Sequence, residues 1–582
     1  MLSLCMLALV VGVVTGYGAV VFRALVALIH NVAFYGVFSI NYDANLLTAP
    51  STWGPLVILV PVIGGLFVVF LVNTFAPEAK GHGVPEVMNA IYFEQGRIRP
   101  MVALVKSVAS SLSIGTGASV GREGPIIQIG SSLGSSIAQM FNLQTGQRIT
   151  LLAAGAGAGI AATFNTPLGA VLFAIELMMP EVSTRTFLPV VIATGAATYI
   201  GRISFGLAPA FEVPLAAVPQ VSAVDLQALI VYVVLGLLCG IAAWALIRSM
   251  LVTSTLFKKM PGNDYTRHAV GMLSIGILMY VLLLTGGNYY VDGVGYGVIQ
   301  EILRGTMTSL PLLVILFFAK LYATSVSIGS GASGGVFSPS LFVGATLGAA
   351  VGVVGNMIFP DAGITPVEFA LVGMGGVVAA GTGAAMTAII MIFEMTRDYN
   401  IIVPLVVAVA IALGFRRMII SETIYTSKLV LRGRHIPKER HSNMFMVHPV
   451  REIMTSDQIY IDASLRVSEA IDKIGPSPMA KPLVVMEGGR IAGVIPDVTA
   501  LYAVAGDQGH KALKEVIKED FVVVVDDMNM YDVIKRMERR KARAAVVVRP
   551  CRGVPRQDDI RGVITKSHIA DSVVSSMQHY IG

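Results

Sequence analysis

The chain has 582 residues, of which 54% are hydrophobic and only 13% are charged. Soluble globular proteins carry about a quarter charged residues, so this composition excludes an ordinary soluble enzyme or binding module. The formal net charge of +6 is mild, and Cys5, Cys239 and Cys551 lack the spacing of a disulfide framework or a zinc site.

The charged residues are unevenly distributed along the chain. Of the 78 Asp, Glu, Lys and Arg residues, 32 lie in residues 1–410 and 46 in the remaining 172. The first part therefore has the composition of a segment embedded in lipid, and the second has the composition of a domain in water.

Apolar runs recur through the first part, and most are long enough to cross a bilayer or nearly so. They cover residues 2–19, 56–72, 228–247, 270–284, 312–319 and 403–415. Two further apolar runs, 151–179 and 371–395, are interrupted by glycines. Such broken segments at corresponding places in two halves indicate broken helices around a transport site.

The two halves are an internal duplication. Residues 113–134 read SIGTGASVGREGPIIQIGSSLG, and residues 327–348 read SIGSGASGGVFSPSLFVGATLG, with half of the positions identical at an offset of 214. Lys106 falls on Lys320 at the same offset. After a small shift, AVLFAIE ending at Glu176 matches AIIMIFE ending at Glu394.

The distribution of Lys and Arg predicts the orientation of the chain. The stretches 38–55 and 207–222 contain neither residue, whereas the loop near 258–267 and the segment after Phe415 are rich in both. Cationic loops favour the cytoplasmic side of a membrane, so we expect the C-terminal tail in the cytoplasm.

The tail itself reads as two small α/β modules. QIYID, a helix near 464–474, PLVVM and IAGVI form the first; FVVVV, a helix near 528–540, AAVVV and RGVI form the second. We expect domains at 1–435 and 447–582, with a linker at 436–446.

One motif, Gly121-Arg122-Glu123-Gly124-Pro125, carries the strongest chemical signal. A proline suits the first turn of a helix, and helix N-termini bind anions through unpaired N–H groups. A carboxylate at this point can occupy the anion site, and its protonation would make room for a real anion. The alternative is that Glu123 merely caps a helix, although an ionisable group at membrane depth favours a functional role.

With this motif and three others in order, residues 1–435 resemble the CLC chloride channel and transporter family. The family pattern Gly-Ser-Gly-Ile-Pro is GHGVP at 81–85, and Gly-Gly-Ile-Phe-Ala-Pro is GGVFSP at 334–339. The fourth motif is Tyr425 in SETIYTSKL, which matches the family tyrosine whose hydroxyl closes the inner end of the anion path. The resemblance implies a mostly α membrane protein, a CLC-type inverted-repeat helical bundle that forms homodimers, followed by a cytoplasmic α/β CBS pair. It makes Glu123 the gate, and it implies an anion path formed by His82, Gly83, Gly121, Arg122, Gly124, Val336, Phe337 and Tyr425.

Two departures from the family pattern affect the expected mechanism. His82 replaces the serine whose hydroxyl donates to the central anion, so anion binding is either pH-sensitive or left to the neighbouring glycine amides. Leu177 stands where proton-exchanging members carry a second glutamate just after the position of Glu176. We therefore expect a passive chloride channel, with a proton-coupled chloride exchanger as the alternative. Glu176 and Glu394 are interpreted as buried helix partners.

The tail resembles a CBS pair whose adenine nucleotide sites are degraded. The second module has Thr565 but His568 in place of an acid, and the first has Pro496 and Thr499 in the corresponding places. Nucleotide binding is therefore a weak expectation beside a regulatory or dimerisation role.

The remaining expectations concern partners and competing functions. We expect chloride as the substrate, with other small anions as alternatives, membrane lipid around the first domain, and no nucleic acid or metal. The isolated carboxylates argue against a cation carrier, and no nucleophile with a base or HExxH cluster indicates an enzyme.

Overall fold

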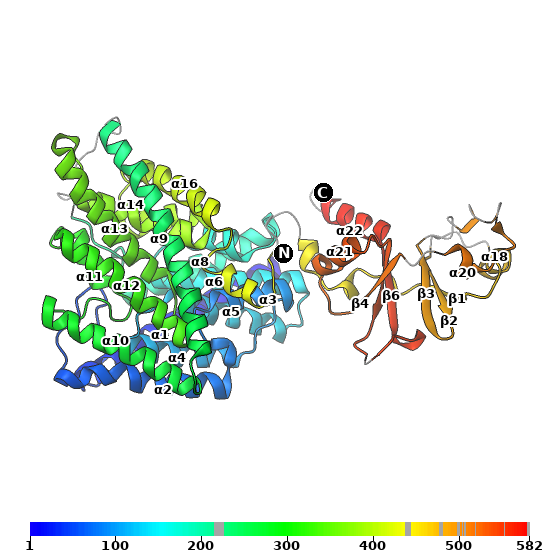
Figure 1. Cartoon of the computed structure of the whole chain (residues 1–582), viewed down its shortest axis with the longest axis horizontal. Helices are drawn as coiled ribbons and strands as arrows, with labels where there is room; N and C mark the ends of the chain where they lie inside the picture. The colour runs from blue at the N-terminus through cyan, green and yellow to red at the C-terminus, as the bar shows by residue number, and fades with distance from the viewer. Residues whose placement is uncertain are drawn as a thin grey trace. The chain divides into compact units, whose positions relative to one another are not determined.

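The computed structural model describes residues 1–214, 226–436, 444–475, 481–496, 501–502, 505, 508–517, 520–551 and 553–578. The chain forms two compact units, Met1–Arg440 and His441–Gly582 (Figure 1). The linker expected at 436–446 lies largely outside the described residues.

The first unit is helical. Its helices are α1 (Leu2–Tyr35), α2 (Val60–Phe75), α3 (Val84–Phe93), α4 (Met101–Gly115), α5 (Glu123–Met140), α6 (Thr145–Phe164), α7 (Pro167–Phe173), α8 (Thr184–Phe205), α9 (Leu226–Lys259), α10 (Asp264–Gly286), α11 (Tyr296–Leu303), α12 (Leu310–Ser330), α13 (Phe337–Ile358), α14 (Pro366–Thr382), α15 (Ala385–Thr396), α16 (Ile402–Ile419) and α17 (Thr426–Leu431). Within the described ranges, eight helical segments are long and apolar enough to cross a membrane.

Several helices are longer than their apolar runs because a cation within them finds a partner. Helix α1 continues beyond residue 19, and the Arg23 guanidinium lies 4.3 Å from the centre of the Phe205 ring. Helix α12 continues through Lys320, whose Nζ donates to the carbonyls of Val291 and Gly293 at 3.0 and 3.1 Å. A prediction from hydropathy alone ends the segment at such a charged residue. The helix itself continues, because its backbone hydrogen bonds are not interrupted there.

The duplication is visible as a two-fold relation between equivalent residues. The amides of Gly121 and Gly335, 214 residues apart, donate to each other's carbonyl oxygens at 2.7 and 2.6 Å. The Ser119 amide donates to Ser327 Oγ, and the equivalent Ser333 amide donates to Ser113 Oγ, both at 3.1 Å. Helix α5 packs on α6, as α13 packs on α14. The two repeats therefore meet antiparallel at the loops that precede α5 and α13.

The second unit contains two sheets with the same topology. The first module has β1 (Ile459–Asp462), α18 (Val467–Ile474), β2 (Leu483–Glu487), β3 (Arg490–Ile495) and α20 (Leu513–Val516). The second has β4 (Phe521–Val525), α21 (Met530–Arg539), β5 (Ala544–Val548), β6 (Ile560–Thr565) and α22 (Lys566–Gln578). In each sheet the middle strand pairs parallel with the first strand and antiparallel with the third.

The two modules share an apolar core. Val484, Met486 and Val494 of the first sheet cluster with Val546 and Val563 of the second. These strands have buried faces on both sides of the sheet, as their near-continuous β-branched sequences predict. The strands and the helices α18 and α21 lie where the sequence predicts them, whereas the sequence prediction includes neither α20 nor α22.

Candidate functional site

Three helices begin close together at the junction of the two repeats. Gly81 and Ser333 form a parallel β-bridge just before α3 and α13. Gly121 and Gly335 form an antiparallel β-bridge just before α5 and α13. The first turn of each helix has amides without an intrahelical acceptor. The convergence of α3, α5 and α13 therefore creates a positive region without a full cation.

Glycines make this convergence possible. A Cβ on Gly124 would overlap the carbonyl oxygen of His82 and lie 2.9 Å from the Cα of Gly335. Gly83, directly before α3, has a φ of +81° and could not readily be another residue. The glycines of these motifs thus allow the backbones before α3, α5 and α13 to approach one another closely.

The Glu123 carboxylate lies at this junction and is only 1% exposed. Its Oε2 accepts a hydrogen bond from the Ser338 backbone amide at 3.2 Å, in the first turn of α13. Its Oε1 accepts from the hydroxyls of Ser338 and Tyr296, which are themselves 3.0 Å apart. The carboxylate therefore occupies donors that would otherwise bind an anion.

Sequence reasoning missed Tyr296, although a signal for it was present. Gly293-Val294-Gly295 repeats the Gly81-His82-Gly83 pattern at an offset of 212, and Gly295 has a φ of +80°. Tyr296 begins α11 just as Val84 begins α3. This weaker repeat places the Tyr296 hydroxyl at the same junction.

Two buried lysines hold the loops of the two repeats. Lys106 Nζ donates to the carbonyls of Ala79 and Gly81 at 3.0 and 2.6 Å, as Lys320 does to Val291 and Gly293. Both side chains are fully buried. The lysine pair found in the sequence is therefore structural in equivalent places, and each lysine fixes the loop that precedes a short helix.

The remaining residues proposed for the path surround the Glu123 junction. Val336 and Phe337 start α13, and Tyr425 directly precedes α17 with 1% exposure. The His82 and Tyr425 ring centroids are 6.1 Å apart. The Arg122 guanidinium instead lies over the rings of Tyr296 and Phe164, at 5.0 and 5.6 Å. Within the described residues, no hydrogen bond or ion pair joins Arg122 to Glu123. The Arg122 side chain therefore packs on the two aromatic rings and does not bind Glu123.

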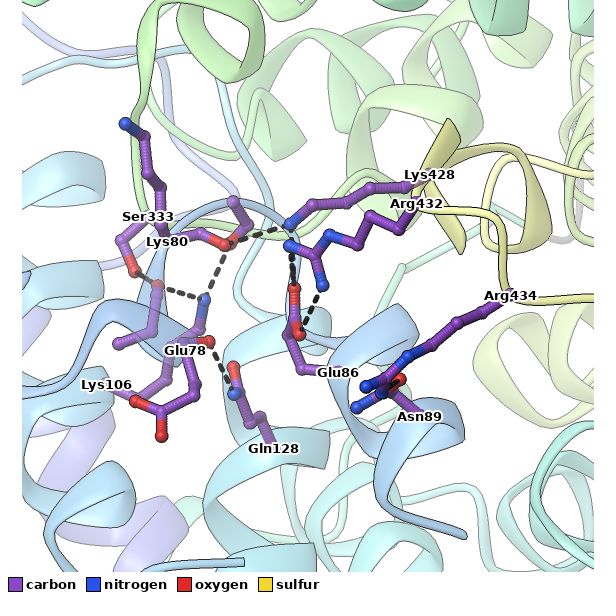
Figure 2. A network of polar contacts seen from close by, with 12 residues as sticks. Glu78, Lys80, Glu86, Asn89, Lys106, Gln128, Ser333, Lys428, Arg432 and Arg434 are labelled. Carbon is purple, nitrogen blue, oxygen red and sulfur yellow. Dashed lines mark hydrogen bonds and ion pairs between the residues drawn. The ribbon is translucent and has the colours of Figure 1, made fainter. Parts of the chain in front are cut away.

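His82 also lines a cavity of about 280 Å³. The cationic residues around this cavity are Lys80, Lys258, Arg267, Lys428 and Arg432. Figure 2 shows Lys428 and Arg432 of α17 directed toward Glu86 of α3, where the Lys428 Nζ and both terminal Arg432 nitrogens lie 2.9 Å from carboxylate oxygens. Lys80 pairs with Asp264 at 2.9 Å. The cavity thus has an excess of positive charge and includes His82 in its lining.

Glu176 and Glu394 cap helices of the opposite repeat, which agrees with their interpretation as helix partners, but both are half-buried and not buried as expected. Glu176 accepts from the amides of Met386 and Thr387 at the start of α15. Glu394 accepts from the equivalent amides at the start of α7, those of Leu168 and Gly169. Both carboxylates are therefore committed to structure.

Leu177 follows Glu176 in a π-helical turn, Ala174–Met178, and is 2% exposed. An apolar side chain in this buried turn has no group that can bind a proton. The position that family exchangers use for proton delivery is therefore filled by hydrocarbon.

The candidate nucleotide residues of the tail are partly described. The Thr565 hydroxyl lies 2.7 Å from Ser567 Oγ and accepts from the His568 amide, so it caps α22. Thr499 lies outside the described residues, and nothing structural follows for it. Among the described residues, no three His, Cys, Asp or Glu side chains are grouped as they would be around a metal ion.

Two family models match this chain. One, described as voltage gated chloride channel, matches residues 64–417, and one for the CBS domain matches residues 513–575.

Curated relatives agree with this match. A protein of Vibrio cholerae serotype O1 named H(+)/Cl(-) exchange transporter ClcA is 34% identical over 375 residues, covering 62% of this chain and 76% of the relative. A ClcA of Salmonella agona is 32% identical over 413 residues, covering 70% of this chain and 84% of the relative.

Solved structures show the same fold. A slow cyanobacterial Cl⁻/H⁺ antiporter has a TM-score of 0.64 at 26% identity, covering 74% of this chain and 97% of that one. A eukaryotic CLC transporter has a TM-score of 0.63 at 19% identity and covers 97% of this chain and 98% of its own, so the likeness of fold includes the tail. These matches agree with the two-fold repeat and with the position of Glu123 at three converging helix starts. The chain therefore belongs to the voltage-gated chloride channel family, the CLC family, and carries a CBS tail.

Proposed function

We propose that this protein exchanges chloride for protons across its membrane, with Glu123 as the group for which both ions compete. The observation that carries the proposal is the buried Glu123 carboxylate bound to the Ser338 amide at the start of α13. A deprotonated Glu123 and a chloride ion need the same donors. Protonation removes the charge of the side chain and releases those donors to the anion.

The exchanger is preferred to the passive channel expected from Leu177. Relatives that cover most of the membrane unit are named H(+)/Cl(-) exchange transporters, and a structural neighbour above 25% identity is a Cl⁻/H⁺ antiporter. Leu177 excludes proton delivery at one position, but it leaves the competition at Glu123 intact. A passive channel remains the second candidate because Leu177 favours it.

In this mechanism the anion path uses mainly backbone donors. We expect the amides of Gly83, Gly124, Val336 and Phe337 to line the path, and Tyr425 to narrow its inner end beside His82. Gly121 contributes its small size and not its amide, because that amide donates to the Gly335 carbonyl. Lys80, Lys258, Arg267, Lys428 and Arg432 would raise the local chloride concentration in the cavity. The helix-start donors then replace the hydration shell of the anion.

The test uses purified protein in vesicles with an outward chloride gradient and equal pH on both sides. The membrane potential is held at zero by potassium and its ionophore, while chloride efflux and external pH are recorded together. We expect chloride efflux to drive protons inward, so that the external medium becomes alkaline. Glu123→Ala serves as the uncoupled reference, and chloride efflux without proton movement in the wild type would establish the passive channel instead.

Three further proposals concern the dimer, the location of the tail and the role of the tail. We propose that each chain contributes one transport path to a homodimer in a lipid bilayer, and that the tail lies in the cytoplasm, which the cationic segment after Phe415 favours. The tail would regulate transport or hold the dimer together. Adenine nucleotide binding there stays a weak expectation, because the Thr565 hydroxyl already caps α22.

A further inference from the structure

A chloride/proton exchanger needs a group that brings protons to Glu123 from the inner side of the path. This chain lacks the glutamate that the family uses there. Leu177 cannot bind a proton, and the Glu176 carboxylate beside it is bound to Met386 and Thr387. A different residue must therefore deliver protons to Glu123 if the proposed function holds.

The geometry points to His82 as that residue: we infer that its imidazole takes protons from the cationic cavity and delivers them to Glu123. This inference rests on the proposed exchange function and names its internal proton-transfer group. It goes beyond hydrogen bonding to the anion, which a serine at this position would also provide.

His82 lies between the cavity and the gate. The residue belongs to the lining of the cavity, and its backbone carbonyl lies against Gly124, the residue after Glu123. The side chain is only 3% exposed, and its Nδ1 has no hydrogen-bond partner among the described residues. A buried polar atom without a partner is costly, which indicates a ligand that binds there during function.

Three other ionisable groups near His82 and Glu123 are already bound to protein groups. Lys106 and Lys320 each hold two backbone carbonyls, and Glu86 is paired with Lys428 and Arg432. Histidine is also the side chain whose ordinary titration lies nearest neutral pH. Its charge change suits a group that must both accept and release a proton in each cycle.

The charges that face His82 provide a reason for coupling. Lys428 and Arg432 on α17 and Lys106 on α4 are positive, while Glu86 on α3 is negative but shared by Lys428 and Arg432. An imidazolium alone is therefore repelled by its surroundings. A chloride ion beside it offsets that repulsion, so chloride binding and His82 protonation favour each other by the same free energy.

The proton transfer balances without another reactant. Neutral His82 accepts a proton from cavity water and becomes imidazolium. It then releases the proton through water in the path to the Glu123 carboxylate, so that the imidazole is again neutral and Glu123 becomes an uncharged acid. Glu123 leaves the α13 donors, and chloride takes its place.

The experiment measures protons moved per chloride in vesicles for the wild type, His82→Gln and His82→Ser. Glutamine keeps a hydrogen-bond donor but cannot titrate, and serine is the residue of the family pattern. We expect proton movement per chloride to fall by about 10²-fold or more in both variants, as expected on removing a positioned proton-transfer group. His268→Gln is the matched control, because His268 is a buried histidine hydrogen-bonded to Ser330, and its variant should keep the wild-type ratio.

A rescue variant separates proton delivery from a structural effect. Leu177→Glu added to His82→Ser restores a carboxylic acid at the family position, and we expect it to restore proton movement. Wild-type coupling that survives in His82→Gln and His82→Ser would overturn the inference alone. A wild type that passes chloride without protons would refute the proposed function, and the inference with it.

Discussion

The hydroxyls of Tyr296 and Ser338 should set the pH at which the Glu123 gate opens. Both donate to Glu123 Oε1, and all three side chains are at least nine-tenths buried, so water cannot readily replace a lost donor. A hydrogen bond to a charged group is worth about 1.5–3 kcal/mol. Since one pH unit corresponds to about 1.36 kcal/mol, losing one donor should shift half-activation by about 1–2 pH units.

The direction of the shift follows from which form of Glu123 the hydroxyls stabilise. They donate to the ionised carboxylate, so Tyr296→Phe or Ser338→Ala makes the ionised, blocking form less stable. Protons then open the gate at lower concentration, and half-activation of chloride flux moves to higher pH. The double variant should shift less than the sum of the two single shifts, because the two hydroxyls are 3.0 Å apart and share one oxygen.

The assay is initial chloride efflux from vesicles between acid and alkaline pH. Tyr289→Phe is the matched control, because Tyr289 is an equally buried tyrosine whose hydroxyl accepts from the Ser51 amide instead. Half-activation that stays within about 0.3 pH units of the wild type in both single variants would refute the reasoning, since that is under 0.5 kcal/mol.

Three further outcomes follow from the contacts described above. Glu123→Gln keeps the shape of the gate without its titration, so proton movement should cease while chloride still flows; proton movement that persists with chloride flux would contradict the competition at this residue. Lys106→Met and Lys320→Met should each lower the free energy of unfolding by about 1–3 kcal/mol for every buried carbonyl left without a donor. The variants should therefore melt at a lower temperature in detergent, and an unchanged melting curve would count against the role of the lysines. Val546→Ala, in the core shared by the tail sheets, should lower the free energy of unfolding of the tail by about 1.5–3 kcal/mol, measured by hydrogen exchange. Val554 is 63% exposed, so Val554→Ala should change that free energy by under about 0.5 kcal/mol.

Much of the membrane fold could be predicted from the sequence because its repeats are explicit. The offset of 214 places Gly121 opposite Gly335, and these residues hydrogen-bond across the two-fold axis. The GREGP motif likewise locates Glu123, because glycines and a proline at a helix start leave few other uses for a carboxylate.

The partners of Glu123 and the true helix ends were harder to predict. Tyr296 comes from a distant loop, and its G-x-G signal is short, so only the tertiary structure shows that its hydroxyl reaches Glu123. Arg23 and Lys320 interrupt hydropathy within helices because their partners, an aromatic ring and loop carbonyls, lie far away in sequence. Leu177 predicts a channel only if its position is the sole entry for protons.

The relation between the two ions can be tested most directly by letting one gradient move the other ion. Vesicles containing the protein are prepared with equal chloride on both sides, an acidic interior and the membrane potential held at zero. The account predicts that proton exit drives net chloride uptake although no chloride gradient exists at the start. If the pH gradient moves no chloride while a chloride gradient alone does, the protein is a passive chloride pathway and the exchange mechanism is wrong.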